Sequence, residues 1–318
     1  MGSPSAAAST DAAAPFGRVL TAMVTPFHAD GSLDVDGAAA LATYLVDDGG
    51  NDGLVISGTT GESPTTTDAE KDRLLRAVVQ AVGGRAHVIA GVGTNDTAHS
   101  VHLAEAAAAA GADGLLVVTP YYSKPPQAGL LAHFVAVADA GGLPCLLYDI
   151  PGRTAIAIAT ETLVRLAEHP RVVAVKDAKG DLEASSWVMA RTGLAYYSGD
   201  DKDTLPLLSI GAVGVVGVPT HLVGRRVGEM IAAYGAGDVT GALRLHRELL
   251  PVFTGFFRAQ GVILTKAALG LAGLPGGPVR LPLIDATDAE IAVLRADLAA
   301  AKVDLDLDSP AAAERAAS

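Results

Sequence analysis

The sequence has few of the features that mark several large protein classes. It has one cysteine in 318 residues, which excludes an internal disulfide and fits a reducing, cytoplasmic location. Its 23 basic residues against 35 acidic ones give a net charge of −12, without the basic clusters that nucleic-acid binding requires. No apolar run is long enough to cross a bilayer, because charged residues, histidine and glycine interrupt the alanine-rich segments. We therefore expect neither a nucleic-acid partner nor a membrane segment.

The two ends of the sequence are expected to be disordered. Residues 1–16 are rich in alanine and serine, lack the basic region of a signal peptide, and have Asp11 where its apolar centre would lie. Residues 303–318 mix acidic residues with alanine and have few large apolar residues to bury. These features predict a disordered lead over 1–16 and a disordered tail over 303–318.

Between the ends, short apolar runs alternate with alanine-rich segments of helical period. This alternation predicts parallel strands joined by right-handed helical crossovers. The expected strands are 19–24, 53–57, 87–91, 114–119, 144–148, 172–176, 194–198 and 214–218. The expected helices between them are 35–48, 68–82, 97–110, 127–140, 160–168, 182–192 and 204–210, and those after the last strand are 222–234, 241–257, 261–271 and 288–302.

The number and spacing of these units predict an α/β fold, a (β/α)8 TIM barrel with a C-terminal helical extension. We place the barrel over residues 17–235 and the extension over 236–302. An open doubly wound sheet is the alternative. It is disfavoured because the glycines of 91–96 and 211–217 do not match a dinucleotide-binding turn.

Lys176 ends an apolar run of the kind found in strands buried on both faces. A lysine at such a strand end lies at the rim of an apolar interior, where desolvation lowers the pKa of its amine. A partly neutral amine is the nucleophile that carbonyl chemistry needs. The alternative is a lysine that reaches solvent and pairs with Asp177 or Asp181.

Other polar residues follow the expected strands at the same rim. Thr59 and Thr60 lie in a glycine-framed turn after the second strand, and the fourth strand runs into Tyr122. The fifth strand ends at Tyr148, with Arg153 shortly after it. Each residue has an ordinary structural explanation, but together with a lysine they supply what a Schiff base with a 2-oxo acid requires.

Four blocks carry a resemblance to a known family: Gly58-Thr-Thr-Gly-Glu62, Thr119-Pro-Tyr-Tyr122, Tyr148 with Pro151 and Arg153, and Val175-Lys176-Asp177. In this order the chain resembles the pyruvate-dependent class I aldolases, the family that includes dihydrodipicolinate synthase and N-acetylneuraminate lyase, over residues 17–282. The resemblance implies condensation of pyruvate with L-aspartate 4-semialdehyde, the first committed step of diaminopimelate and lysine biosynthesis. It further implies a homotetramer built from tight dimers.

The resemblance also implies roles for the residues at the rim. Lys176 would form the imine with pyruvate, and no other cofactor and no metal is expected. Tyr148, Thr59 and Tyr122 would form a proton relay, with Tyr122 supplied by a neighbouring subunit. The remaining implied contacts are Thr60 with the pyruvate carboxylate, Arg153 with the carboxylate of the aldehyde substrate, and Gly199 and Val216 as pocket lining.

Departures from the family pattern lead to further expectations. Gly217 replaces a residue that is often serine and is expected to loosen the pocket, while Lys179 adds a cation expected to affect the pKa of Lys176. Asp68, Lys71 and His99 stand where lysine-inhibited members tend to have His, His and Glu, so we expect weak or absent inhibition by lysine.

Two alternative functions remain open from the sequence. One is a pyruvate-dependent aldolase that acts on sugar acids, and the other is a barrel that binds a small acid without catalysis. His99 and His102 share a helical face, but no third ligand completes a metal site.

Overall fold

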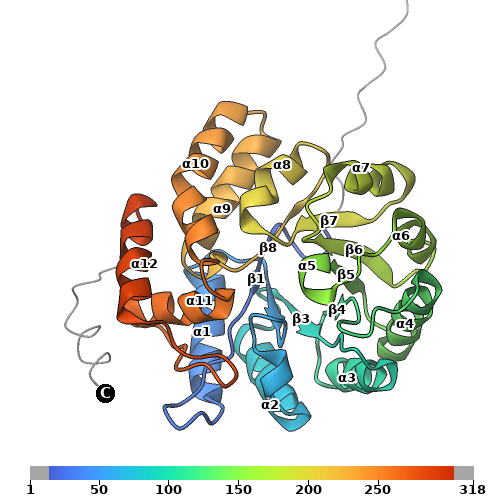
Figure 1. Ribbon diagram of the computed structural model, residues 1–318, viewed down its shortest axis with the longest axis horizontal. Coiled ribbons are helices and arrows are strands. Elements are labelled where there is room, and N and C mark those ends of the chain that lie inside the picture. Colours follow the sequence, from blue (N-terminus) through green and yellow to red (C-terminus); the bar gives the residue numbers. More distant parts are fainter. Residues whose placement is uncertain (1–13, 304–318) are drawn as a thin grey trace, which may run out of the picture.

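The computed structural model describes residues 14–303, and they form a closed barrel of eight parallel strands in sequential order (Figure 1). This confirms the predicted fold class. The strands are β1 (Val19–Ala22), β2 (Gly53–Ile56), β3 (His87–Gly91), β4 (Gly114–Val118), β5 (Cys145–Asp149), β6 (Val172–Asp177), β7 (Ala195–Ser198) and β8 (Gly214–Gly217).

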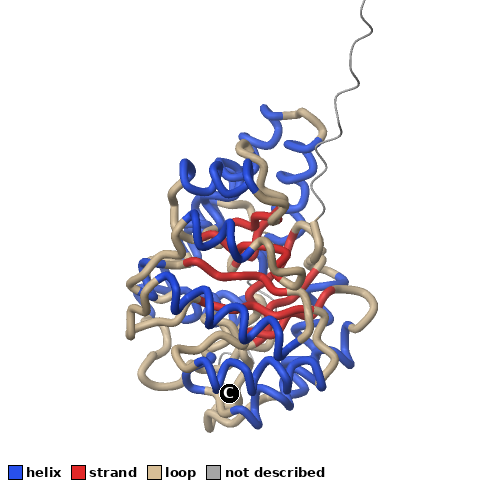
Figure 2. The backbone as a smooth tube through the Cα atoms, turned by 90° about the vertical axis from the view of Figure 1, so that its right-hand side faces the viewer, coloured by secondary structure: helices blue, strands red, loops and turns tan. Residues whose placement is uncertain are grey.

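Helices surround the strands, so the barrel is enclosed on its outer face (Figure 2). The helices of the barrel are α1 (Val35–Asp47), α2 (Asp68–Val82), α3 (Thr97–Ala109), α4 (Gln127–Gly141), α5 (Pro151–Thr154), α6 (Thr160–Leu166), α7 (Leu182–Arg191), α8 (Thr204–Leu208) and α9 (Thr220–Gly235). Two 3-10 turns, Ser63–Thr65 and Asp201–Asp203, lie in the loops after β2 and β7. No helix within residues 14–303 is both long enough and apolar enough to cross a membrane.

The C-terminal extension consists of α10 (Val239–Gly255), α11 (Gly261–Leu271) and α12 (Asp288–Ala300). Helix α10 packs on α9, and both α10 and α11 contact α12. In Figure 1 these helices lie together on one side of the barrel, coloured orange to red. The extension therefore packs on α9, the last helix of the barrel, through α10 and α11.

Capping residues explain where several helices begin. Thr67 and Glu70 form a reciprocal capping box at α2, and Thr287 and Glu290 form another at α12. At α3 the cap is Asp96, whose carboxylate accepts the Ala98 N–H, and Thr97 is the first helical residue, as the expected helix 97–110 has it. An aspartate outranks threonine at this position because its carboxylate also interacts favourably with the helix dipole.

The core lies in two connected layers. Leu41, Val78 and Phe134 belong to the layer between strands and surrounding helices. Inward-facing residues such as Leu20 and Ile89 fill the barrel, and their cluster continues into the extension. The barrel interior is thus solid, and chemistry is confined to its ends.

The described residues begin inside the segment that was expected to be disordered. Most of the expected lead (residues 1–13 of 1–16) and most of the expected tail (residues 304–318 of 303–318) lie outside the described residues. Phe16, however, is 2% exposed, and its backbone N–H donates to the Tyr197 hydroxyl. Its ring packs against Gly114, at the start of β4, so an aromatic side chain covers the end of the barrel where the strands begin.

Candidate active site

Lys176 and Tyr148 lie side by side where β6 and β5 end. They are register partners in neighbouring strands, and the Lys176 Nζ lies 4.3 Å from the centroid of the Tyr148 ring. Lys176 is 4% exposed and Tyr148 is 5% exposed. The lysine therefore does not reach solvent, and neither alternative partner takes it: Asp177 accepts the Ser185 hydroxyl, and Asp181 caps α7.

Burial lowers the pKa of Lys176 from 10.5 to about 8, with the Asp201 carboxyl opposing this effect and the Arg153 charge adding to it. At pH 7 an amine with this pKa is neutral about a tenth of the time, against about one part in 3000 for an ordinary lysine. The site therefore supplies a usable concentration of nucleophile near neutral pH.

Asp201 is a buried acidic residue near Lys176, to which the sequence alone assigned no role. It is 1% exposed, and its Oδ2 accepts the Val218 N–H at 3.1 Å. Burial raises its pKa to about 7. Its sequence signal is its place shortly after the expected strand 194–198, and the fold brings it near Lys176.

Tyr148 connects the lysine to a cavity of about 190 Å³. Thr59, Tyr121 and Arg153 also line this cavity. Burial raises the pKa of Tyr148 to about 12, while Arg153 and a hydrogen bond with Thr59 oppose the rise. A phenol of this kind stays protonated and can pass a proton between a substrate and the threonine hydroxyl.

Arg153 comes from α5, a single helical turn that the sequence analysis did not predict. Pro151 occupies its first turn, which is a helix-start signal that was present in the sequence. Because the turn follows β5 directly, it places Arg153 at the cavity that Tyr148 lines.

The remaining residues expected at the site are Thr60, Val216, Gly199 and Tyr122. Thr60 is 8% exposed beside Thr59, and Val216 is buried in β8. Gly199 lies against Lys176, where an added Cβ would come within 3.0 Å of the lysine Cγ. Within this chain Tyr122 does not line the cavity: it is 89% exposed and has a left-handed φ of 73°. Its contribution to a neighbouring subunit stays a prediction.

Two expectations drawn from the departures are wrong. Lys179 pairs with the buried Asp149 at 3.5 Å, and the charges that shift the pKa of Lys176 come from other residues. Gly217 does not loosen the pocket, because an added Cβ would lie 2.3 Å from the Asp201 Oδ1. The glycine leaves space that the carboxylate fills.

Within residues 14–303, the His, Cys, Asp and Glu side chains form no group of three placed to hold a metal ion. His99 instead pairs with Asp68 at 3.0 Å. The groups gathered near this rim are the Lys176 amine, the Tyr148 phenol, the hydroxyls of Thr59 and Thr60, and the Arg153 side chain. A (β/α)8 barrel with a buried lysine of low pKa at this end is characteristic of lyases that form a Schiff base.

Comparisons with known proteins agree with this class. The model of the dihydrodipicolinate synthetase family matches residues 15–301. The chain is 78% identical over 288 residues to the 4-hydroxy-tetrahydrodipicolinate synthase of Acidothermus cellulolyticus, covering 91% of this chain and 93% of the relative. The chain belongs to the dihydrodipicolinate synthetase family.

Solved structures lead to the same result. The Cyanidioschyzon merolae enzyme with lysine bound has a TM-score of 0.89 and 44% identity, covering 91% of this chain and 99% of that one. The chloride-inhibited Acinetobacter baumannii enzyme in complex with pyruvate has a TM-score of 0.86 and 34% identity, covering 91% and 99%. The expected function, that of a 4-hydroxy-tetrahydrodipicolinate synthase of lysine biosynthesis, is confirmed.

Proposed function

We propose that the chain condenses pyruvate with L-aspartate 4-semialdehyde, using the amine of Lys176 as the nucleophile. The amine attacks the C2 carbonyl of pyruvate, and loss of water leaves an imine. A proton then leaves the methyl carbon, and the resulting enamine forms a carbon–carbon bond with the aldehyde, which becomes an alcohol. The amino group of the former aldehyde substrate then attacks the imine carbon, and ring closure releases the Lys176 amine. The observation that carries this proposal is the buried Lys176 Nζ, 4.3 Å from the Tyr148 ring centroid, with a pKa of about 8.

Tyr148 and Thr59 are assigned to proton transfer. Water leaves the tetrahedral intermediate only if its oxygen is protonated, and the carbon acid must then lose a proton. A protonated phenol hydrogen-bonded to a hydroxyl serves both steps without holding a charge in a buried site. Thr60 and the neighbouring backbone N–H groups are assigned to the pyruvate carboxylate.

Arg153 is assigned to the carboxylate of the aldehyde substrate. Arg153 lines the same cavity as Tyr148 and Thr59. A planar guanidinium binds a carboxylate through two parallel hydrogen bonds. The positive charge also lowers the pKa of Lys176, so the arginine supports the nucleophile as well.

We further propose a homotetramer that works in the cytoplasm. Tyr122 is 89% exposed on this chain, which fits a side chain that completes the relay of a neighbouring subunit. On α7, Leu182 and Trp187 are 42% and 58% exposed, and an apolar pair of this size is available for a second interface.

Borohydride reduction tests the proposal. In the presence of pyruvate, reduction is expected to leave a stable adduct on the peptide that contains Lys176, and Lys176→Ala is expected to lose both adduct and turnover. Tyr148→Phe and Thr59→Val are expected to lower kcat by about a hundredfold or more, as is typical when a general acid or base is removed. An adduct on another lysine would reject the assignment. Sedimentation of Tyr122→Ala and Trp187→Ala tests the two interfaces.

A further inference from the structure

The extension contacts the turn that carries Thr59 and Thr60 through a buried ion pair. Lys266, on α11, places its Nζ 2.6 Å from the Glu62 Oε1, and the two side chains are 2% and 1% exposed. The same Nζ donates to the Pro278 carbonyl at 2.7 Å, in the segment between α11 and α12. A charged group from the extension is therefore buried directly behind the turn after β2.

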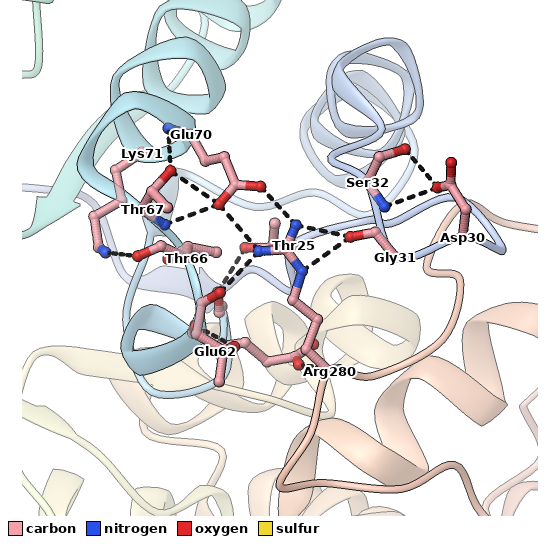
Figure 3. A network of polar contacts seen from close by, with 12 residues as sticks. Thr25, Asp30, Gly31, Ser32, Glu62, Thr66, Thr67, Glu70, Lys71 and Arg280 are labelled. Carbon is pink, nitrogen blue, oxygen red and sulfur yellow. Dashed lines mark hydrogen bonds and ion pairs between the residues drawn. The ribbon is translucent and has the colours of Figure 1, made fainter.

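Arg280 adds a second connection, in the same segment. Its backbone N–H donates to the Glu62 Oε2 at 2.8 Å, and its guanidinium donates two hydrogen bonds to Glu70 and one to the Thr65 carbonyl. It also donates to the Gly31 carbonyl in the loop after β1 (Figure 3). One side chain of the extension thus connects the loops that follow β1 and β2.

Phe27 fills the space between the two cations. The Lys266 Nζ lies 4.3 Å from its ring centroid, and the Arg280 Cζ lies 4.0 Å from it. Cations over an aromatic face are stabilised, more so when they are withdrawn from water. The aromatic ring therefore fixes the positions of the two cations beside Glu62.

Glu62 is joined directly to the proposed catalytic residues. Its backbone adopts a left-handed φ of 54°, which is unfavourable for a residue other than glycine and persists only where surrounding contacts impose it. Its N–H donates to the Thr59 carbonyl at 3.2 Å. On its other side, the Thr25 hydroxyl donates to the Gly61 carbonyl at 2.6 Å. The conformation of Glu62 consequently sets where the turn presents Thr59 and Thr60.

We propose that Lys266 and Arg280 are positioning residues for the reaction, which hold the 59–62 turn in its working conformation through Glu62. The C-terminal extension is then part of the catalytic apparatus, although none of its residues lines the cavity. This inference rests on the roles proposed above for Thr59 and Thr60. A buried ion pair suits such a task because its geometry is specific, whereas apolar contacts at the same place would stabilise several arrangements of the turn.

Substitutions on the two sides of the ion pair test the inference. Lys266→Met and Glu62→Gln are expected to lower kcat/KM for pyruvate by about tenfold or more and to slow borohydride-trappable imine formation. Arg258→Met is the matched control, because it breaks an ion pair with Asp297 inside the extension without touching the turn. The control is expected to keep kcat/KM within about twofold of the parent, with all rates measured well below each variant's unfolding temperature.

The double variant Glu62→Leu/Lys266→Met separates positioning from stability. It replaces the buried charges by apolar groups, a change that often restores thermal stability. Loss of imine formation in a double variant with parental Tm supports positioning. Parental kcat/KM in the double variant, or in Lys266→Met itself, overturns it. Thr59→Val, assayed in parallel, distinguishes this inference from the proposed function. A parental kcat/KM in Thr59→Val rejects both the role of Thr59 and this inference. A lowered kcat/KM in Thr59→Val together with a parental kcat/KM in Lys266→Met rejects this inference alone.

Discussion

Asp201 is expected to control the pH at which Lys176 becomes reactive. Its carboxyl opposes the effect of burial on the pKa of Lys176, so Asp201→Asn should move that pKa below its present value of about 8. A fall of one unit corresponds to about 1.4 kcal/mol and raises the neutral fraction of the amine at pH 7 from about a tenth to about a half. The rate of imine formation at subsaturating pyruvate should then rise by up to about fivefold.

The pH dependence of this gain follows from the carboxyl itself. Because the pKa of Asp201 is about 7, its charge is present mainly above that pH, and the variant should differ least from the parent in acid. Stopped-flow trapping of the imine between pH 6 and 9 measures both curves. Asp203→Asn is the control, since Asp203 belongs to the same 3-10 turn but does not shift the pKa of Lys176. An unchanged inflection, or one moved to higher pH, would refute the reasoning.

Three further outcomes are expected. Lys176→Met should raise the free energy of unfolding by up to about 3 kcal/mol at pH 7, because the folded-state pKa of the buried amine lies below its unfolded value of 10.5. This gain in stability should fall to about half by about pH 9.5, which is closer to the unfolded pKa. Urea denaturation at both pH values checks this. Gly217→Ala should lower the free energy of unfolding by about 1–3 kcal/mol and disturb the active site, because its methyl group would meet the Asp201 Oδ1. Thermal unfolding and kcat measure the two effects. An unaltered Tm would contradict the packing argument. Free lysine should not inhibit the condensation at submillimolar concentration, because Asp68 and His99 already pair with each other. A steady-state titration with lysine measures this, and inhibition in that range would contradict the prediction.

Local sequence patterns were sufficient for the barrel. A strand buried on both faces needs a continuous apolar run, and a surface helix needs a periodic one, so both signals lie within single segments. The strand ends shifted by only a residue or two, as with β1, which ends at Ala22. Lys176, Tyr148 and Arg153 were proposed as site residues in the same way, because parallel strands bring all their carboxyl ends to one rim. The family resemblance then supplied the reaction.

The tertiary structure alone decided which charged groups meet. Asp201 reaches Lys176, and Lys266 reaches Glu62, across separations along the chain that no local period encodes. Lys179 was expected to act on Lys176 because it is close in sequence, yet it pairs with Asp149 on a neighbouring strand. A buried charge must find its partner wherever the fold places one, since water cannot replace it. For this protein the sequence alone therefore determined the scaffold and the place of Lys176 at the end of a strand, while the folded structure decided the electrostatic environment of its amine and the contacts behind the threonine turn.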